Sequence, residues 1–235
     1  MKAKILQNLM WILLCSITLF WSLFSYETFK IFAREDGWAE NLTAIFYFIA
    51  TLFFIIYLIK CHNKEQIYFL NFVGKYKFYI LFLLMFLFIG GEEISWGQRI
   101  FNFSTPEDLL KINKQSEFNL HNIEFFDTFW GGQYRALSLM ALTLGCLFPV
   151  LNLNKLINKF MRTINFPIIN LSLIMLFFGT YIMGKIGSAI LPDTQNITEL
   201  RELHFSFGFF IFAFDELISI KSKVNLSNVK LRSVK

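Results

Sequence analysis

Residues 78–99 read FYILFLLMFLFIGGEEISWGQR, an apolar run that ends directly in two glutamates. The apolar part is close to the roughly 20 residues that a helix needs to cross a bilayer. Every backbone amide inside hydrocarbon must be satisfied within the segment, and a continuous apolar run favours a helix over the alternating pattern of a barrel strand. The stretch therefore predicts a transmembrane helix with paired carboxylates at one end.

The whole chain has the composition of a membrane protein. Of its 235 residues, 55% are hydrophobic, 19% are aromatic and 17% are charged, which is too apolar for a soluble domain. We therefore expect an all-α fold, a polytopic transmembrane helical bundle forming one integral membrane domain over residues 1–235. Its apolar runs place about six spans near residues 6–25, 42–59, 78–96, 134–153, 166–184 and 203–220. The first run should remain as a helix, because bulky residues follow it where a signal peptide has a small-residue cleavage site.

The charged residues are distributed among the loops in a way that predicts the topology. The N-terminus, the loops after the second and fourth spans and the C-terminal tail hold 14 of the 22 Lys and Arg residues, whereas 14 of the 17 acidic residues fall on the opposite side. The positive-inside rule then makes both termini cytoplasmic and turns the acidic loops outward. Because the basic residues are scattered through short loops, nucleic acid is not expected as a partner. The three cysteines form no CxxC motif and imply no disulfide framework.

Two glutamates and an arginine mark the polar end of the third span. On a continuous helix Glu92, Ser95 and Arg99 share one face, and Glu93 points elsewhere. A carboxylate inside a span is costly unless it is paired or faces a polar cavity, so Glu92 and Glu93 are candidate functional groups. The alternative is structural: Glu92 pairs with Arg99, or both acids lie just above the hydrocarbon.

The loop after this span contains two patterns. Thr105 and Pro106, followed by two acids, are typical of a helix start with Thr105 as the N-cap, and they predict a short interfacial helix along the membrane surface. From residue 113 to residue 121 polar residues alternate, and in an extended chain they would project to one side. We expect this edge to line a polar pocket, although a solvated loop shows similar residues. The edge consists of Asn113, Gln115, Glu117, Asn119 and His121.

Two further acidic segments fall on the same predicted side. Glu199 and Glu202 are one helical turn apart, just before the sixth span. Glu35, Asp36 and Glu40 precede the second span. Taken singly, each segment is typical of solvated acids in a first helical turn. Together with the two glutamates of the third span, they predict one shared, outward-facing polar site.

The side chains of this site suit a divalent metal. Carboxylates with one or two imidazoles bind Mg²⁺, Mn²⁺ or Zn²⁺. The ligands that we expect are Glu40, Glu92, His121 and Glu202. The sequence has no HExxH, Walker or catalytic GxSxG motif, so the metal hypothesis rests on the residue types alone and the identity of any cofactor stays open.

Four stretches resemble a family of uncharacterised bacterial multi-pass membrane proteins. They are EDGWAEN at 35–41, GEEISWGQR at 91–99, INKQSEFNLHN at 112–122 and the acidic segment before the sixth span. The resemblance spans most of the chain, and it implies a location in the bacterial cytoplasmic (inner) membrane. It also implies that nine residues matter, without assigning their roles: Glu35, Glu40, Glu92, Glu93, Gln98, Arg99, Glu117, Asn119 and His121.

A fainter similarity is to the alkaline ceramidase and progestin-receptor-like superfamily of membrane hydrolases. Both place an acidic and aromatic stretch before an early helix. Members of that superfamily hold zinc with several histidines, including a pair on a late helix. The present chain departs from this pattern, because His121 and His204 are the two histidines on its predicted outer side.

The function we expect is that of a membrane-embedded enzyme, a hydrolase or transferase that is metal-dependent if a metal binds, acting on a lipid or lipid-linked headgroup. Its candidate catalytic residues are Glu92, Glu93 and His121. Its candidate substrate-binding residues are Gln98, Arg99, Asn113, Gln115, Glu117 and Asn119. One alternative is a transporter or cation-binding module, and the apolar middles of the second and third spans rank transport lower. A further alternative is an assembly or scaffold subunit. The substrate, the reaction and the oligomeric state stay open.

Overall fold

The computed structural model is all-α, as the sequence predicts. It describes residues 2–34, 36–65, 67–113, 116–120, 123, 133–191 and 194–232, and the one β feature within them is an isolated antiparallel bridge between Asn113 and Ile123. The helices are α1 (Lys2–Phe24), α2 (Tyr26–Phe32), α3 (Trp38–Glu65), α4 (Phe69–Glu93), α5 (Gln98–Phe101), α6 (Glu107–Leu110), α8 (Gln133–Leu142), α9 (Phe148–Leu151), α10 (Lys155–Thr163), α11 (Ile174–Ile190) and α12 (Thr194–Arg232).

Within the described ranges, five helices are long and apolar enough to cross a membrane. They are Ile5–Phe24, Trp38–Glu65, Phe69–Glu93, Leu171–Ile190 and Thr194–Ile220. The number rises to six if Arg135–Leu151 and Lys155–Thr163, which meet at a bend of 118°, are taken as one broken span. A π-helical turn, Thr143–Leu147, joins α8 to α9 inside this segment. The structure therefore confirms an all-α helical bundle, in which five to six of the described segments are long and apolar enough to span a membrane.

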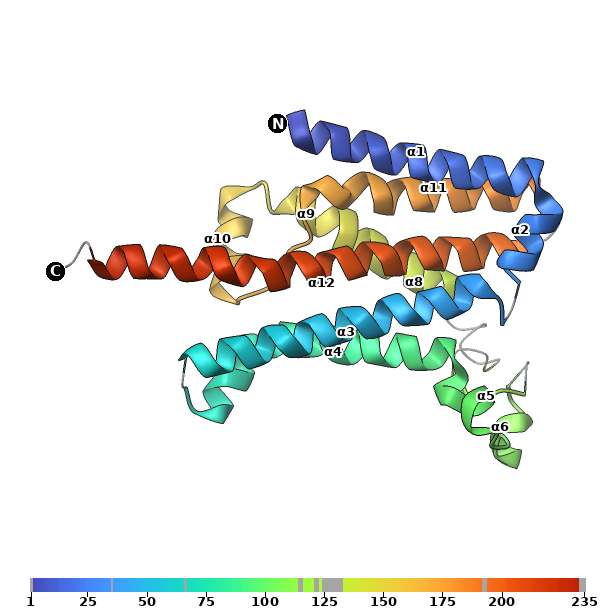
Figure 1. The fold of residues 1–235 in the computed structure, drawn as a ribbon, viewed down its shortest axis with the longest axis horizontal. Coiled ribbons are helices and arrows are strands. Elements are labelled where there is room, and N and C mark those ends of the chain that lie inside the picture. Colours follow the sequence, from blue (N-terminus) through green and yellow to red (C-terminus); the bar gives the residue numbers. More distant parts are fainter. Residues whose placement is uncertain are drawn as a thin grey trace.

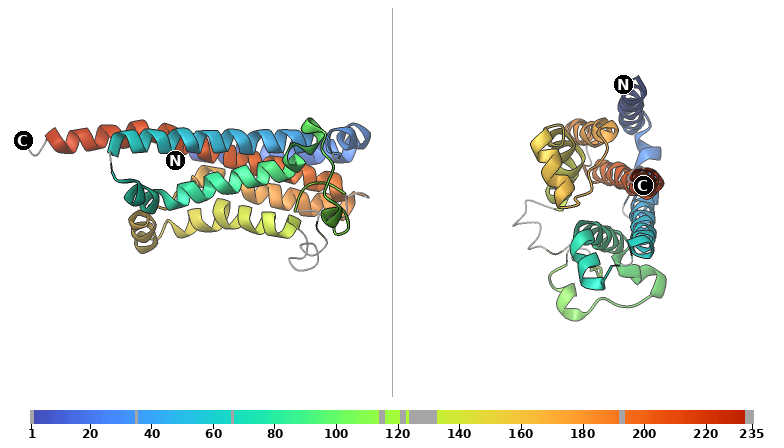
Figure 2. Two further views of the ribbon diagram at one scale, coloured as in Figure 1. Left: turned by 90° about the horizontal axis from the view of Figure 1, so that it is seen from below. Right: turned by 90° about the vertical axis from the view of Figure 1, so that its left-hand side faces the viewer.

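The long helices run back and forth between two ends of the bundle (Figure 1). We call the end where α4 stops and α12 begins the loop end, because α2, α5 and α6 lie there; the opposite tail end holds both termini and α10 (Figure 1). Seen along its length, the bundle has α12 near its centre, between α11 on one side and α3 on the other (Figure 2). α4 packs against α3, and α1 packs against α11.

A central seam of side chains joins α3, α4 and α12, and its residues recur every seven positions. The repeat is Glu40, Tyr47 and Phe54 on α3; Glu93, Phe86 and Tyr79 on α4; and Glu202, Phe209 and Glu216 on α12. A seven-residue repeat keeps one helix face against its neighbours along the whole length of a bundle. The seam therefore places Glu40, Glu93 and Glu202 at the loop end and Glu216 beside Tyr79 at its other end, with aromatic rings between them.

Two aromatic layers fill the seam below the acids. The ring centroids of Tyr47, Phe86 and Phe209 lie 5.3–6.3 Å apart. Those of Phe54, Phe82 and Phe212 lie 5.4–6.2 Å apart in the next layer. Every ring in these layers is buried. The interior of this three-helix seam is therefore closed by aromatic packing beneath its polar end.

α12 begins nine residues before the predicted start of the sixth span, at Thr194 instead of residue 203. This earlier start puts Glu199 and Glu202 inside the helix, where both are buried, instead of in a solvated first turn. A hydropathy window averages over all faces of a helix, so it misses polar residues that are buried against protein. The fifth span is displaced for a related reason: residues 166–170 are not helical, and the span runs to Ile190 rather than residue 184.

The third predicted span also ends early, at Glu93 rather than residue 96. Three successive residues after it, Ser95, Trp96 and Gly97, have positive φ angles of 47°, 53° and 82°. Such angles reverse the chain and cost about 1–2 kcal/mol per residue that is not glycine. The assumption that Glu92, Ser95 and Arg99 share one continuous helix face was therefore wrong.

Candidate functional site

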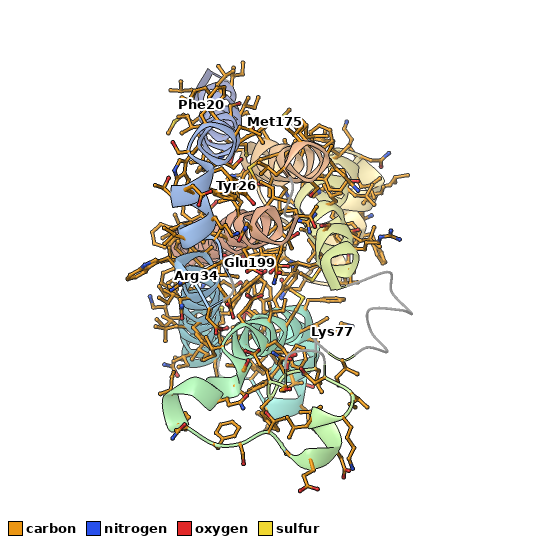
Figure 3. The ribbon with its side chains drawn as sticks, turned by 90° about the vertical axis from the view of Figure 1, so that its right-hand side faces the viewer. Phe20, Tyr26, Arg34, Lys77, Met175 and Glu199 are labelled. Atoms are coloured by element: carbon orange, nitrogen blue, oxygen red, sulfur yellow. The ribbon has the colours of Figure 1, made fainter. Side chains whose placement is uncertain are left out.

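Three glutamates from two helices meet at the loop end, and we call them the carboxylate cluster: Glu93 of α4 with Glu199 and Glu202 of α12. One carboxylate oxygen from each lies within 4.8 Å of the other two. Glu199 and Glu202 are buried. Glu93 is half-buried as a whole residue, but its carboxylate lies inside the cluster. Figure 3, which looks onto the loop end, shows Glu199 near the centre of the bundle and Phe20 at its edge.

The charges in this cluster need compensation. At an effective dielectric constant of about 20, two unit charges 4.8 Å apart repel by about 3.5 kcal/mol. Three such pairs would cost about 10 kcal/mol, which is comparable to the stability of a whole domain. The cluster must therefore hold a proton, a positively charged neighbour or a bound cation.

Tyr47 of α3 lies directly beneath the cluster. The whole residue is inaccessible to solvent, and its hydroxyl has no hydrogen-bond partner in the part of the chain that the structure describes. Side chains lean toward the N-terminus of their helix, so Tyr47 leans toward the loop end where α3 begins, and Glu93, at the C-terminal end of α4, leans inward to meet it. The Tyr47 hydroxyl accordingly interacts electrostatically with Glu93 and Glu202.

Glu92 has a different environment from Glu93, although the two are adjacent. One carboxylate oxygen of Glu92 accepts a hydrogen bond from the Trp96 indole N–H, and the other accepts one from the Leu120 backbone N–H at 2.7 Å. The Glu92 side chain is buried. Both oxygens are therefore engaged in holding the reversed chain and the following loop against the end of α4.

Further hydrogen bonds between side chains join the end of α4 to the loop that ends near residue 119. Ser95 donates to the Glu117 carboxylate at 2.7 Å, and Asn119 donates to the same carboxylate oxygen at 2.7 Å and to the Ser95 hydroxyl at 3.1 Å. Asn113 donates to the side-chain and backbone oxygens of Asn119, each at 2.9 Å. We call this set of residues, with Glu92 and Trp96, the loop network. It brings together Asn113, Glu117 and Asn119, which the sequence assigned to substrate binding.

The loop differs from the extended edge that the alternation predicts. Ser116 has a φ of 60° and its backbone N–H bonds to Asn113, so the chain turns there. Thr105 is not an N-cap either, because Pro106 occupies that position before α6 and no side chain caps the helix. Instead the Thr105 hydroxyl donates to the Ser116 carbonyl and accepts from Gln98. Long-range hydrogen bonds fix this loop backbone, because Thr105 bonds the Ser116 carbonyl and Gln98 and Glu92 accept the backbone N–H groups of Phe118 and Leu120.

The structure describes three of the four predicted metal ligands, and it places them in different surroundings. Among the described residues, Glu202 lies with Glu93 and Glu199, while Glu92 serves the loop network. A carboxylate oxygen of Glu40 accepts the backbone N–H of Asp36 at the start of α3, although Glu40 also interacts electrostatically with Glu93. Four parts of the sequence predictions lie outside the described residues: Glu35, Gln115, His121 and the side chain of Arg99.

His204 and Arg201 are buried on α12 but contact α11. The Nδ1 atom of His204 lies 3.5 Å from the Thr180 hydroxyl. The Arg201 side chain lies against Gly184, where an added Cβ would be 2.8 Å from its Cδ. His204 is two residues after Glu202, so on the same helix it points away from the two glutamates. The donors of the described cluster are therefore carboxylates only.

Sequence reasoning missed Tyr47 and left Glu199 out of the predicted metal set. Tyr47 lies in an apolar run with several other aromatic residues that are buried or half-buried, so its hydroxyl is inconspicuous. The available signal was its spacing: Tyr47 is seven residues after Glu40 and shares its helix face. Comparisons with protein-family models, with curated proteins and with solved structures find no match to this chain. The fold and site therefore define a class only, a helical membrane protein with buried carboxylates at one end of its bundle.

Proposed function

We propose that this protein is a membrane-embedded enzyme, a hydrolase or transferase, that acts on a lipid or lipid-linked headgroup at the loop end of its bundle. The observation that carries this proposal is the gathering of Glu93, Glu199 and Glu202 at the end of the membrane-spanning helices. The ends of membrane-spanning helices lie at the depth of the lipid headgroups. Buried carboxylates at a polar boundary supply the acid, base or ligand groups that such chemistry needs.

In this proposal the two polar regions have separate tasks. The carboxylate cluster performs the chemistry, and the loop network holds the segment from Ser95 to Leu120 against it. Gln98 supports that task, because its amide oxygen accepts the Phe118 backbone N–H at 2.6 Å and its amide nitrogen donates to Thr105 at 2.8 Å. The same loop, with Arg99 and His121, is where we expect a headgroup to bind. The termini are cytoplasmic and the loop end faces outward under the positive-inside rule.

A second candidate function is a cation-binding or transporting module. The carboxylate cluster favours cation binding, but the two aromatic layers beneath it fill the seam that a cargo would have to cross. Transporters carry their binding groups near the bilayer midplane, often beside interrupted helices. We therefore rank transport below a headgroup enzyme.

Lipid profiling of cells that lack the protein tests the proposal. A substrate lipid should accumulate, and the native chain should restore the profile whereas Glu202→Gln should not. Glu107→Gln, which changes an exposed acid of α6, is the matched control and should restore it fully. An unchanged lipid profile in the deletion strain, or full restoration by Glu202→Gln, would overturn the enzyme function.

A further inference from the structure

The carboxylate cluster and the buried hydroxyl of Tyr47 lie together at the loop end and offer oxygen donors only. We infer that Glu93, Glu199 and Glu202 bind one hard divalent cation of the Mg²⁺ or Mn²⁺ type, and that the Tyr47 hydroxyl forms a hydrogen bond with a water molecule on that cation. The inference deepens the proposed function, since it concerns the same site, but cation binding can be measured without any substrate.

The donor set supports a hard cation. The described cluster contains three carboxylates and no thiol, and the nearby His204 lies on the side of α12 that faces Thr180. Oxygen donors of this kind are preferred by Mg²⁺ and Mn²⁺, whereas zinc sites usually contain nitrogen or sulfur. The oxygens lie within 4.8 Å of one another, so an ion placed between them is at most about 2.8 Å from each, and a small inward shift of the side chains brings all three to the Mg²⁺–oxygen bond length of about 2.0–2.1 Å.

Tyr47 is an observation independent of the acids. Buried hydroxyls nearly always have a partner, and this one has none among the described residues although no part of it is accessible to solvent. Mg²⁺ usually keeps several of its waters when it binds protein carboxylates. A water on the inner side of the ion would give the hydroxyl its missing partner, since a phenol both donates and accepts hydrogen bonds.

The packing around Tyr47 fixes the position of its hydroxyl. Its ring contacts Phe86 of α4 and Phe209 of α12, with centroids 5.7 and 6.3 Å away. Gly90 of α4 allows this close approach, because an added Cβ there would lie 3.2 Å from the Tyr47 Cβ. The hydroxyl is therefore held by rigid helices at the floor of the cluster, as an outer-sphere partner of a metal should be.

The test uses the purified full-length chain in detergent micelles and Mn²⁺ as the probe. Loss of the free Mn²⁺ signal in electron paramagnetic resonance titrations should give about one bound ion per chain, and Mg²⁺ should compete for it. Glu93→Gln, Glu199→Gln and Glu202→Gln should each weaken Mn²⁺ binding at least about 10-fold, since each removes a direct ligand. Glu107→Gln should bind as the native chain does. Absence of a stoichiometric Mn²⁺ site, or native affinity in all three glutamine variants, would overturn the inference.

Tyr47→Phe tests the role of the hydroxyl, with Tyr57→Phe as the matched control. Both residues are buried tyrosines on α3, but Tyr57 stacks on Tyr79 far from the cluster. Removing an outer-sphere partner typically weakens metal binding about 10- to 100-fold, so Tyr47→Phe should bind Mn²⁺ at least about 10-fold more weakly and Tyr57→Phe should be unchanged. Equal affinity of the two variants would refute the Tyr47 assignment while leaving the three carboxylates as ligands.

A measurement on the native chain tests the cation site even if the variants do not fold. Mn²⁺ and Mg²⁺ should raise its thermal unfolding temperature in a concentration-dependent manner, and K⁺ at the same ionic strength should not, because only a bound ion stabilises the folded state by mass action. An equal response to all three ions would count against the site. Cation binding with an unchanged cellular lipid profile would refute the enzyme function alone, and a lipid phenotype without cation binding would refute the cation site alone.

Discussion

The two adjacent glutamates at the end of α4 belong to regions with opposite electrostatic character. Glu92 lies in the loop network, where both of its oxygens accept hydrogen bonds from the following chain. Glu93 lies in the carboxylate cluster, where it interacts electrostatically with Glu202 and Glu199. The first region satisfies its charge with donors, which stabilises the fold. The second region gathers like charges, whose mutual repulsion a proton, a positively charged neighbour or a bound cation must offset.

The difference arises from the rotation between two adjacent residues of one helix. Successive residues on a helix point about 100° apart, so Glu92 and Glu93 cannot face the same neighbour. α4 ends at Glu93, and the chain reversal that follows brings Trp96 back over Gly91, where an added Cβ would lie 2.9 Å from the indole ring. Glu92 therefore faces the returning loop and Glu93 faces α12. The comparison suggests a structural role for the first residue and a functional role for the second, which stability measurements can separate.

The largest expected effect on stability is that of Glu92→Leu. This change removes the charged acceptor of the Trp96 indole N–H and the Leu120 backbone N–H, and hydrogen bonds to a charged group are worth about 1.5–3 kcal/mol each. We expect the unfolding free energy to fall by about 2–5 kcal/mol, measured by denaturant unfolding in micelles with tryptophan fluorescence. For Glu107→Gln the unfolding free energy should fall by less than about 0.5 kcal/mol, as expected for an exposed residue. A Glu92→Leu chain as stable as the native one would remove the distinction between the two regions.

A smaller effect is expected within the loop network, from a double-mutant cycle between Ser95 and Asn119. Each alanine variant should lose about 1–2 kcal/mol, because both side chains are buried and share the Glu117 carboxylate. Their direct contact predicts that the double variant loses less than the sum, with a coupling of about 0.5–1.5 kcal/mol. Ser104→Ala, at an exposed position of the same loop, should be neutral. Strict additivity of the two changes would show that the network is not cooperative.

The fold was largely predictable from the sequence, and the reason is visible in single segments. Continuous apolar runs such as FYILFLLMFLFI have one stable solution in hydrocarbon, so the all-α class and the approximate spans follow from them. The assignment of the acidic segments to one side of the membrane agrees with Glu93, Glu199 and Glu202 meeting at one end of the bundle.

The interior of the site was less predictable because it depends on helix ends. Extending the third span to residue 96 put Glu92 on a false common face with Ser95, since Ser95 and Trp96 adopt left-handed conformations that no local propensity predicts. Starting the sixth span at residue 203 left Glu199 and Glu202 in a solvated turn. Both errors arise because tertiary packing decides where these helices end. The Trp96 indole donates to Glu92, and the polar first turns of α12 are buried against α3 and α11.

The smallest expected effect on stability, and the sharpest test of the comparison, is that of Glu93→Gln. In buffer with a chelator, this change removes a charge from a cluster whose members repel one another, so the unfolding free energy should stay the same or rise by up to about 1 kcal/mol. The sign is opposite to that expected for Glu92→Leu one residue earlier. Adding Mg²⁺ should then stabilise the native chain but not the variant, because the variant has lost a ligand. The measurement is thermal unfolding of both chains in the same micelles, with and without Mg²⁺. If Glu93→Gln instead destabilised the chelated protein by several kcal/mol and Mg²⁺ changed neither chain, Glu93 would be a structural residue like Glu92, and the loop end would contain one polar network rather than two.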